Sequence, residues 1–119
     1  MVDIFRYPKR RLKKLIKEGE YDEAIELGKS LESKYSDDHD FMFIMGSVYF
    51  IVEDPKKALP YFEKSFQLDN SDVETLTLKT NVHLALEEKD KAIDCCKRIL
   101  KLQPKNFEAQ ELLDKLENL

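Results

Sequence analysis

The sequence has no tryptophan, only three glycines and four prolines in 119 residues, and no long apolar run. A membrane-spanning helix needs roughly 18 consecutive apolar residues, so none is predicted here. No stretch has the pattern of a strand, a linker or a low-complexity segment. The first residues show no apolar segment ahead of a small-residue cleavage site, and we therefore expect no secretory leader.

Cysteine is also scarce, because Cys95 and Cys96 are the only two and they are adjacent. Neighbours on a helix point in different directions and cannot form a disulfide without breaking the helix. We expect both thiols to be reduced, which favours a cytoplasmic location. No further cysteine or histidine stands at a spacing that would complete a zinc site.

Motifs of catalysis are missing as well. The sequence has no Gly-rich phosphate loop and no nucleophile motif. Its carboxylates are many but scattered, and no pair is set apart in an apolar context as acid–base catalysis requires. We expect a protein that is not an enzyme and that carries no cofactor and no metal.

The residues that are present describe a soluble helical protein. Hydrophobic residues make up 42% of the chain and charged residues 37%, and the net charge is −4. Such a balance argues against a protein that binds nucleic acid over its whole surface. The length fits a single domain over 1–119 that is large enough to bury a core.

One stretch of the sequence occurs three times. Residues 54–69 (DPKKALPYFEKSFQLD) have counterparts 34 residues earlier and 34 residues later, and Ala24, Ala58 and Ala92 share one position without a gap. A period of this length is typical of stacked helical hairpins.

Apolar spacing and capping residues predict about seven helices joined by short connections, so that consecutive helices are antiparallel neighbours. The first expected helix begins at Pro8 and ends at Gly19, and the next two cover about 22–35 and 40–52. The fourth begins at Pro55, the fifth ends near Leu86, the sixth covers 89–102, and the seventh follows Asn106 to the end of the sequence. Capping is expected from Asp37, Asp38 or Asp40, from Asp54, from a box of Ser71 with Glu74, and from Asn106.

The repeated stretch resembles the tetratricopeptide repeat family. The second copy matches best: Met42 stands where the family favours Trp, and Gly46, Tyr49, Ala58, Phe62 and Ser65 fill the Gly, Tyr, Ala, Phe and Ala positions. The first copy has Leu12 at the small position and Gly28 where a large residue is usual. The third copy has Thr80 at the small position and His83 at the aromatic one.

The resemblance implies an all-α fold, a right-handed superhelical stack of antiparallel helix pairs, or alpha solenoid. The repeats are expected over 5–38, 39–72 and 73–106, followed by a capping helix over 107–119. In this family the first helix of each pair lines a concave groove that binds peptides. The expected groove residues are Lys9, Arg10, Lys13, Lys17, Phe43, Ile44, Ser47, Phe50, Ile51, Thr77, Leu78, Asn81 and Leu84. The same projection also places Arg6, Ile16, Glu74, Glu108, Glu111 and Lys115 on this face.

The leading hypothesis is a cytoplasmic adaptor or scaffold that binds a protein or peptide partner with acidic and apolar residues. Some family members hold acidic chaperone tails in a clamp of Lys, Asn and Arg, but Ile44, Glu74 and Leu78 occupy clamp positions here, so we expect no such clamp. The seven basic residues between Arg6 and Lys17 either anchor acidic groups or form a solvated face.

Two other hypotheses stay open. The apolar helix over 40–52 could instead be buried by its neighbours, or it could pair two copies into a homo-dimer. The oppositely charged ends could also favour head-to-tail contact. Binding of acidic lipid or nucleic acid by the basic helix is a third and weaker hypothesis. His39 is expected to be exposed or to cap a helix, and His83 to contribute packing.

Overall fold

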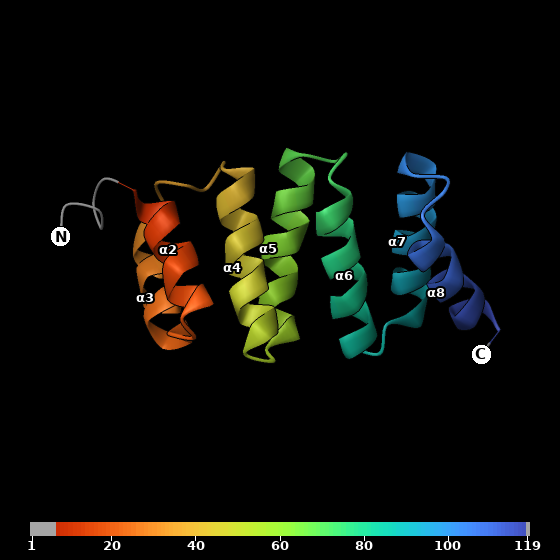
Figure 1. Cartoon of the computed structure of the whole chain (residues 1–119), viewed down its shortest axis with the longest axis horizontal. Coiled ribbons are helices and arrows are strands. Elements are labelled where there is room, and N and C mark those ends of the chain that lie inside the picture. Colours follow the sequence, from red (N-terminus) through yellow and green to blue (C-terminus); the bar gives the residue numbers. More distant parts are fainter. Residues whose placement is uncertain (1–6, 119) are drawn as a thin grey trace.

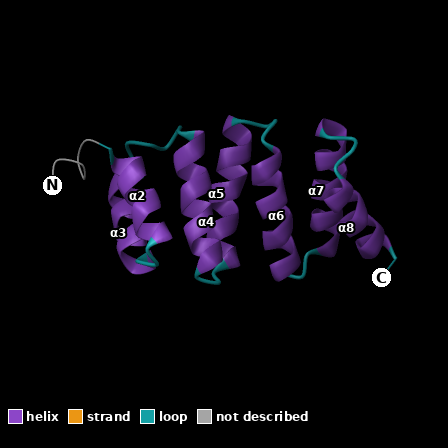
Figure 2. Ribbon diagram, in the orientation of Figure 1, coloured by secondary structure: helices purple, strands orange, loops and turns teal. Residues whose placement is uncertain are grey.

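The computed structural model describes residues 7–118, and the predicted repeat start at residue 5, the candidate Arg6 and residue 119 lie outside that range. Seven helices follow one another: α2 (Pro8–Lys17), α3 (Tyr21–Leu31), α4 (His39–Ile51), α5 (Pro55–Leu68), α6 (Val73–Ala85), α7 (Lys89–Leu102) and α8 (Phe107–Glu117). Residues 7–118 contain no strand (Figure 2). The all-α prediction is confirmed.

The helices form a row of antiparallel pairs (Figure 1). The pairs are α2 with α3, α4 with α5, and α6 with α7, and α8 packs against α7 at the far end. The molecule is elongated, with extents of 52 × 25 × 22 Å. Each hairpin therefore contacts mainly the hairpins beside it, as expected for stacked helical repeats.

The helix ends recur with the same interval as the sequence. Asp38, Asp72 and Asn106 cap α4, α6 and α8 by accepting hydrogen bonds from backbone amides. Gly19, Glu53 and Glu87 each have positive φ and stand two residues after the last residue of the first helix of a pair. Hydrogen bonds from these residues and the next ones back into the helix close each C-terminus in a Schellman-like arrangement.

Two predicted helix ends differ from the structure. The box of Ser71 with Glu74 is wrong: Asp72 accepts the hydrogen bond from the Glu74 amide at 3.0 Å, and the Ser71 hydroxyl donates to Asp69 instead. The helix expected to reach Tyr35 ends at Leu31, because residues 32–37 form turns that lead to the Asp38 cap.

The repeated alanines lie in the core. Ala24, Ala58 and Ala92 are all 0% exposed, which agrees with their predicted role between helices. Helix α4 is buried on several sides, since most of its apolar residues belong to the core. Ile44 is only 5% exposed, Phe43 and Phe50 are half-buried, and Ile51 is exposed. Burial therefore accounts for most of the apolar character of this helix.

Candidate functional site

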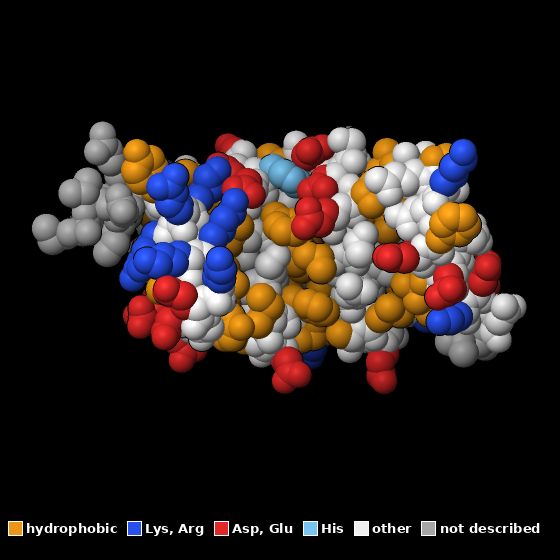
Figure 3. All heavy atoms as spheres, in the orientation of Figure 1, with side chains coloured by type: hydrophobic (Ala, Val, Ile, Leu, Met, Phe, Trp, Pro, Cys, Tyr) orange, Lys and Arg blue, Asp and Glu red, His pale blue; other side chains and the backbone are white. Residues whose placement is uncertain are grey.

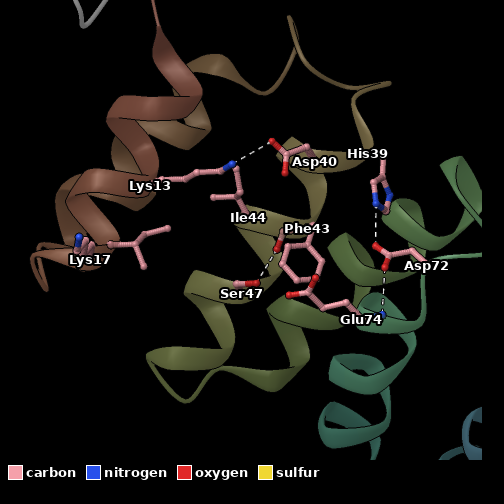
Figure 4. A pocket seen from close by; sticks show the side chains of 10 residues that line it. Lys13, Lys17, His39, Asp40, Phe43, Ile44, Ser47, Asp72 and Glu74 are labelled. Carbon is pink, nitrogen blue, oxygen red and sulfur yellow. Dashed lines mark hydrogen bonds and ion pairs between the residues drawn. The ribbon is translucent and has the colours of Figure 1, made fainter. Parts of the chain in front are cut away.

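A hollow of about 540 Å³ opens on one face of the molecule, between α2, α4 and the start of α6. Figure 3 shows this face, with the cations of α2 at one side and hydrophobic side chains in the middle. We call this hollow the groove. It is lined by Lys13, Ile16, Lys17, His39, Asp40, Phe43, Ile44, Ser47, Asp72 and Glu74 (Figure 4).

The structure brings five of the predicted groove residues together. They are Lys13, Lys17, Phe43, Ile44 and Ser47. Thr77 and Asn81 line a separate, smaller hollow of about 220 Å³ between α6, α7 and α8.

The remaining candidates lie outside both hollows. Lys9 forms an ion pair with Asp38, and the Arg10 guanidinium lies 4.8 Å from the centre of the Tyr7 ring. The others are partly buried against the core or exposed beside it: Phe50, Leu78, Leu84 and Ile51.

The basic wall of the groove comes from α2. Lys13 Nζ lies 3.5 Å from Asp40 Oδ2, so its charge is partly matched. Lys17 has no ion-pair partner within residues 7–118. Lys17 is thus the cation that this wall presents without compensation.

Lys9 fixes this wall to the loop before α4. Its Nζ donates to Asp38 Oδ2 at 2.8 Å, and this hydrogen bond raises the pKa of Lys9. Burial opposes ionisation of the Asp38 carboxyl, but the hydrogen bonds from Lys9 and the Phe41 amide outweigh it and leave the pKa of Asp38 below its usual value. Asp38 therefore caps α4 and joins it to α2 at once.

The floor of the groove is apolar. It consists of Ile16 from α2 with Phe43 and Ile44 from α4. The Phe43 ring packs edge-on against the buried Phe62 ring, with centroids 5.9 Å apart. The Ser47 hydroxyl donates to the Phe43 carbonyl of the same helix. A ligand in the groove could leave this hydrogen bond in place.

The acidic wall is organised by His39, for which the sequence predicts only an exposed or capping position. Its Nε2 lies 2.9 Å from Asp72 Oδ2, and its Nδ1 lies 2.8 Å from the Ser65 carbonyl oxygen. Burial opposes the charge on His39, but these two acceptors outweigh it and raise the pKa of His39. The imidazole thus ties α4 to α5 and α6.

Ser65, His39 and Asp72 are linked in the order of a hydrolase triad, because Ser65 Oγ lies 2.9 Å from His39 Nδ1 and His39 Nε2 lies 2.9 Å from Asp72 Oδ2, but the serine is not accessible to a substrate. The Ser65 side chain is 0% exposed, and its hydroxyl donates to the His39 carbonyl oxygen at 3.1 Å. A nucleophile must instead present its oxygen to the substrate. The cluster therefore holds three helices together.

The other reactive side chains are also engaged or buried. His83 is 3% exposed, which agrees with its predicted role in packing, and it is hydrogen-bonded to Glu88. Cys95 and Cys96 are free and buried, and burial raises the pKa of both thiols. Within the described part of the chain, no group of three or more histidine, cysteine or acidic side chains is arranged to hold a metal ion.

None of the helices in residues 7–118 is long and apolar enough to cross a membrane.

A row of antiparallel helix pairs with a groove along one face defines an α-helical repeat protein. The family of tetratricopeptide repeats matches residues 49–116 of this sequence. The chain belongs to the tetratricopeptide repeat family, whose members are in general non-enzymatic and bind proteins. No curated protein sequence matches the chain.

Several solved structures share the fold. The first tetratricopeptide domain of Spaghetti (RPAP3), bound to the HSP90 peptide SRMEEVD, is 25% identical, with a TM-score of 0.82 over 92% of this chain and 87% of that one. The second domain of human RPAP3, in complex with the HSP70 peptide SGPTIEEVD, is 21% identical, with a TM-score of 0.81 over 92% and 91%. The protein MamA is 20% identical, with a TM-score of 0.87 over 99% of this chain and 64% of that one.

Proposed function

We propose that the chain is a non-enzymatic adaptor that binds a peptide segment of a partner protein in the groove between α2, α4 and α6. The observation that carries this proposal is the open hollow of about 540 Å³, whose floor is apolar and whose edge presents the uncompensated Lys17. Volumes of about 300–1,000 Å³ are usual for sites that enclose a ligand group. The structural relatives with bound peptides support the same class of function.

The chemistry of the walls selects the partner. An apolar side chain would displace water from Ile16, Phe43 and Ile44, and this burial would provide most of the affinity. An acidic side chain would pair with Lys17, the cation of this wall that no described residue matches. A partner segment with apolar and acidic residues therefore matches the groove.

The clamp of Lys, Asn and Arg, with which some family members hold acidic chaperone tails, is not part of this proposal. Ile44 and Leu78 stand at clamp positions and offer no hydrogen-bond donor, and Glu74 would repel an acidic tail. We therefore do not transfer the HSP90 and HSP70 peptides of the relatives to this chain.

We further propose the division into three repeats, 5–38, 39–72 and 73–106, with 107–119 as a closing helix. The 34-residue recurrence of the capping residues Asp38, Asp72 and Asn106 supports these boundaries. A reducing, cytoplasmic environment is proposed from the two free, buried thiols.

The test is a substitution that fills the groove without touching the core. In the Ser47→Arg variant a long side chain would occupy the hollow, while arginine keeps the helix propensity of α4 high. The matched control is Ser33→Arg, the same change in the exposed turn after α3. Both variants should melt within a few degrees of the unmodified protein.

Affinity capture from the native source, compared across these proteins, gives the readout. Partners held in the groove should be retained by the unmodified protein and by Ser33→Arg and lost from Ser47→Arg. If Ser47→Arg retains every partner while it stays folded, the groove is not the binding site.

Self-association is the second candidate that the sequence left open. The burial of Ile44 and the partial burial of Phe43 and Phe50 leave Ile51 and Val52 as the exposed apolar residues at the end of α4. This surface is too small for a stable dimer, so we rank self-association below peptide binding. Light scattering that shows a dimer at about 100 μM would reverse that order.

A further inference from the structure

The groove carries an unmatched charge on each of its two opposite walls. On α2, Lys17 has no ion-pair partner within the described residues. On α6, the Glu74 side chain is exposed and forms no ion pair or hydrogen bond in residues 7–118. Figure 4 shows these two residues at opposite sides, with Phe43, Ile44 and Ser47 between them.

The other charged groups of the groove are already engaged. Asp72 accepts hydrogen bonds from the Glu74 amide and the Thr75 hydroxyl and is paired with His39. Asp40 lies near both Lys9 and Lys13. The charges that remain for a ligand are therefore one ammonium on α2 and one carboxylate on α6.

We propose that the groove is a dipolar receptor: its occupant is a partner segment in which an apolar residue lies between an acidic residue, which faces α2, and a basic residue, which faces α6. This inference rests on the proposed function and specifies the ligand of the same site. The apolar residue covers Ile16, Phe43 and Ile44. The two charges fix the direction in which the segment lies.

Repulsion excludes the simpler alternatives. A segment that is acidic on both sides of its apolar residue would place one carboxylate beside Glu74. A segment that is basic on both sides would meet Lys13 and Lys17. Exposed ion pairs contribute little affinity, whereas unfavourable charge contacts discriminate strongly between partners, so the two walls act mainly on specificity.

The experiment is selection of short random peptides, displayed with blocked carboxyl ends, on the unmodified protein and on charge-reversed variants. Glu74→Lys removes the acidic wall, and Asp22→Lys is its control, because Asp22 is also the second residue of its helix and exposed, but lies on α3. Lys17→Glu removes the unmatched cation. Its control is Lys14→Glu, at an exposed residue of the same helix that does not line the groove.

The unmodified protein should enrich peptides with an acidic, an apolar and a basic residue in one order. Glu74→Lys should lose the preference for the basic residue and keep the other two, and Lys17→Glu should weaken the preference for the acidic residue. For a selected peptide made by synthesis, each reversal should weaken binding by about threefold or more, since an exposed pair contributes up to ~1 kcal/mol. The two controls should bind as the unmodified protein does.

Two results would overturn the proposal, and they are distinguishable. Enriched peptides with apolar and acidic residues alone, unchanged in Glu74→Lys, would refute the dipolar receptor and leave peptide binding in the groove intact. Enrichment no greater than that on Ser47→Arg would refute groove binding itself and the dipolar receptor with it.

Discussion

Glu53 and Glu87 have a backbone conformation that suits glycine. Their φ angles are 62° and 60°, and Gly19 has φ of 79° at the corresponding position of the first hairpin. A side chain in this region costs about 1 kcal/mol relative to glycine. We therefore expect Glu53→Gly to raise the free energy of unfolding by about 0.5–1 kcal/mol, as measured by urea denaturation.

The reciprocal change provides the control. A Cβ at Gly19 would have no atom within 4 Å, so Gly19→Ala tests conformation without a steric clash. It should lower the free energy of unfolding by about 1 kcal/mol. Glu53→Gly with stability equal to or below that of the unmodified protein would contradict this account of the helix ends.

His39 should make stability depend on pH. The His39 ring contacts the Asp72 carboxylate, the Ser65 carbonyl and the Ser65 hydroxyl. The carboxylate and the carbonyl can only accept, so only the doubly protonated ring donates to both of them. The pKa of His39 is raised in the folded protein. The stabilising contribution is therefore complete below the unfolded pKa of about 6.5 and is lost as the pH rises through the folded value.

The measurement compares the unmodified protein with His39→Gln in urea at about pH 6 and about pH 8. Groups common to both proteins, including His83, cancel in the difference between them. The destabilisation caused by His39→Gln should be about 1–2 kcal/mol at the lower pH and smaller at the higher one. If the destabilisation caused by His39→Gln is the same at both pH values, protonation of His39 contributes nothing to the free energy of unfolding.

The roles of some single residues cannot be predicted from the sequence. The role of His39 depends on the turns before α4 and α6, which bring Asp72 to its ring, and no local pattern contains that information. The cap of α6 is ambiguous in the sequence for a related reason. Ser71 and Asp72 are both good capping residues, and only the path of the chain decides between them.

At the scale of helices, two facing positions of a hairpin hold a small and then a large residue in the second hairpin, and a large and then a small residue in the first. Gly46 of α4 faces Phe62 of α5, and a Cβ at Gly46 would come within 2.8 Å of that ring. In the first hairpin the corresponding positions hold Leu12 and Gly28. The sulfur of Met45, from the next hairpin, fills the space beside Gly28.

This exchange predicts different costs for the same substitution. Gly46→Ala should destabilise the protein by about 1–3 kcal/mol, because the fully buried Phe62 ring has little room to move. Gly28→Ala should cost less, because its clash is with the far end of the flexible Met45 side chain, whereas the gain in helix propensity of about 1 kcal/mol is common to both substitutions. Thermal unfolding of the two variants side by side provides the comparison, and an equal or larger loss in Gly28→Ala would contradict it.

The elements themselves follow from the sequence to a large extent. The alanine period sets the register of the hairpins, and the caps and prolines set most helix starts. The residues of the groove are predicted less well from the sequence, because Lys9 and Arg10 on the basic helix contact Asp38 and Tyr7 instead. Which cation stays unmatched depends on how adjacent hairpins pack, and sequence spacing does not encode that directly.

At the scale of the whole molecule, the core is divided along the long axis. One cluster of buried residues joins the first two hairpins, includes Phe41, Met45 and Phe62, and reaches Val82 on α6. A second joins α5 to α8 through Phe66 and Ile99, and a third joins α7 to α8. Stability in such an array is the sum of local units and the contacts between neighbours.

A cavity at one end should therefore leave the other end unaffected. Leu113 on α8 is 7% exposed and packs in the cluster of Ala92 and Cys96. Leu113→Ala should cost about 2–4 kcal/mol locally. Hydrogen exchange measured by mass spectrometry should then show faster exchange in α7 and α8 and little change in α2 and α3.

Glu111→Ala is the control on the same helix, since Glu111 is exposed and its one ion pair, with Lys115, lies on the surface. It should leave exchange nearly unchanged, because such pairs contribute little. If Leu113→Ala instead accelerated exchange equally from α2 to α8, the seven helices would unfold as one cooperative unit. A groove at the α2 end would then lose its shape whenever the far end opened, and binding there would weaken in proportion to that opening.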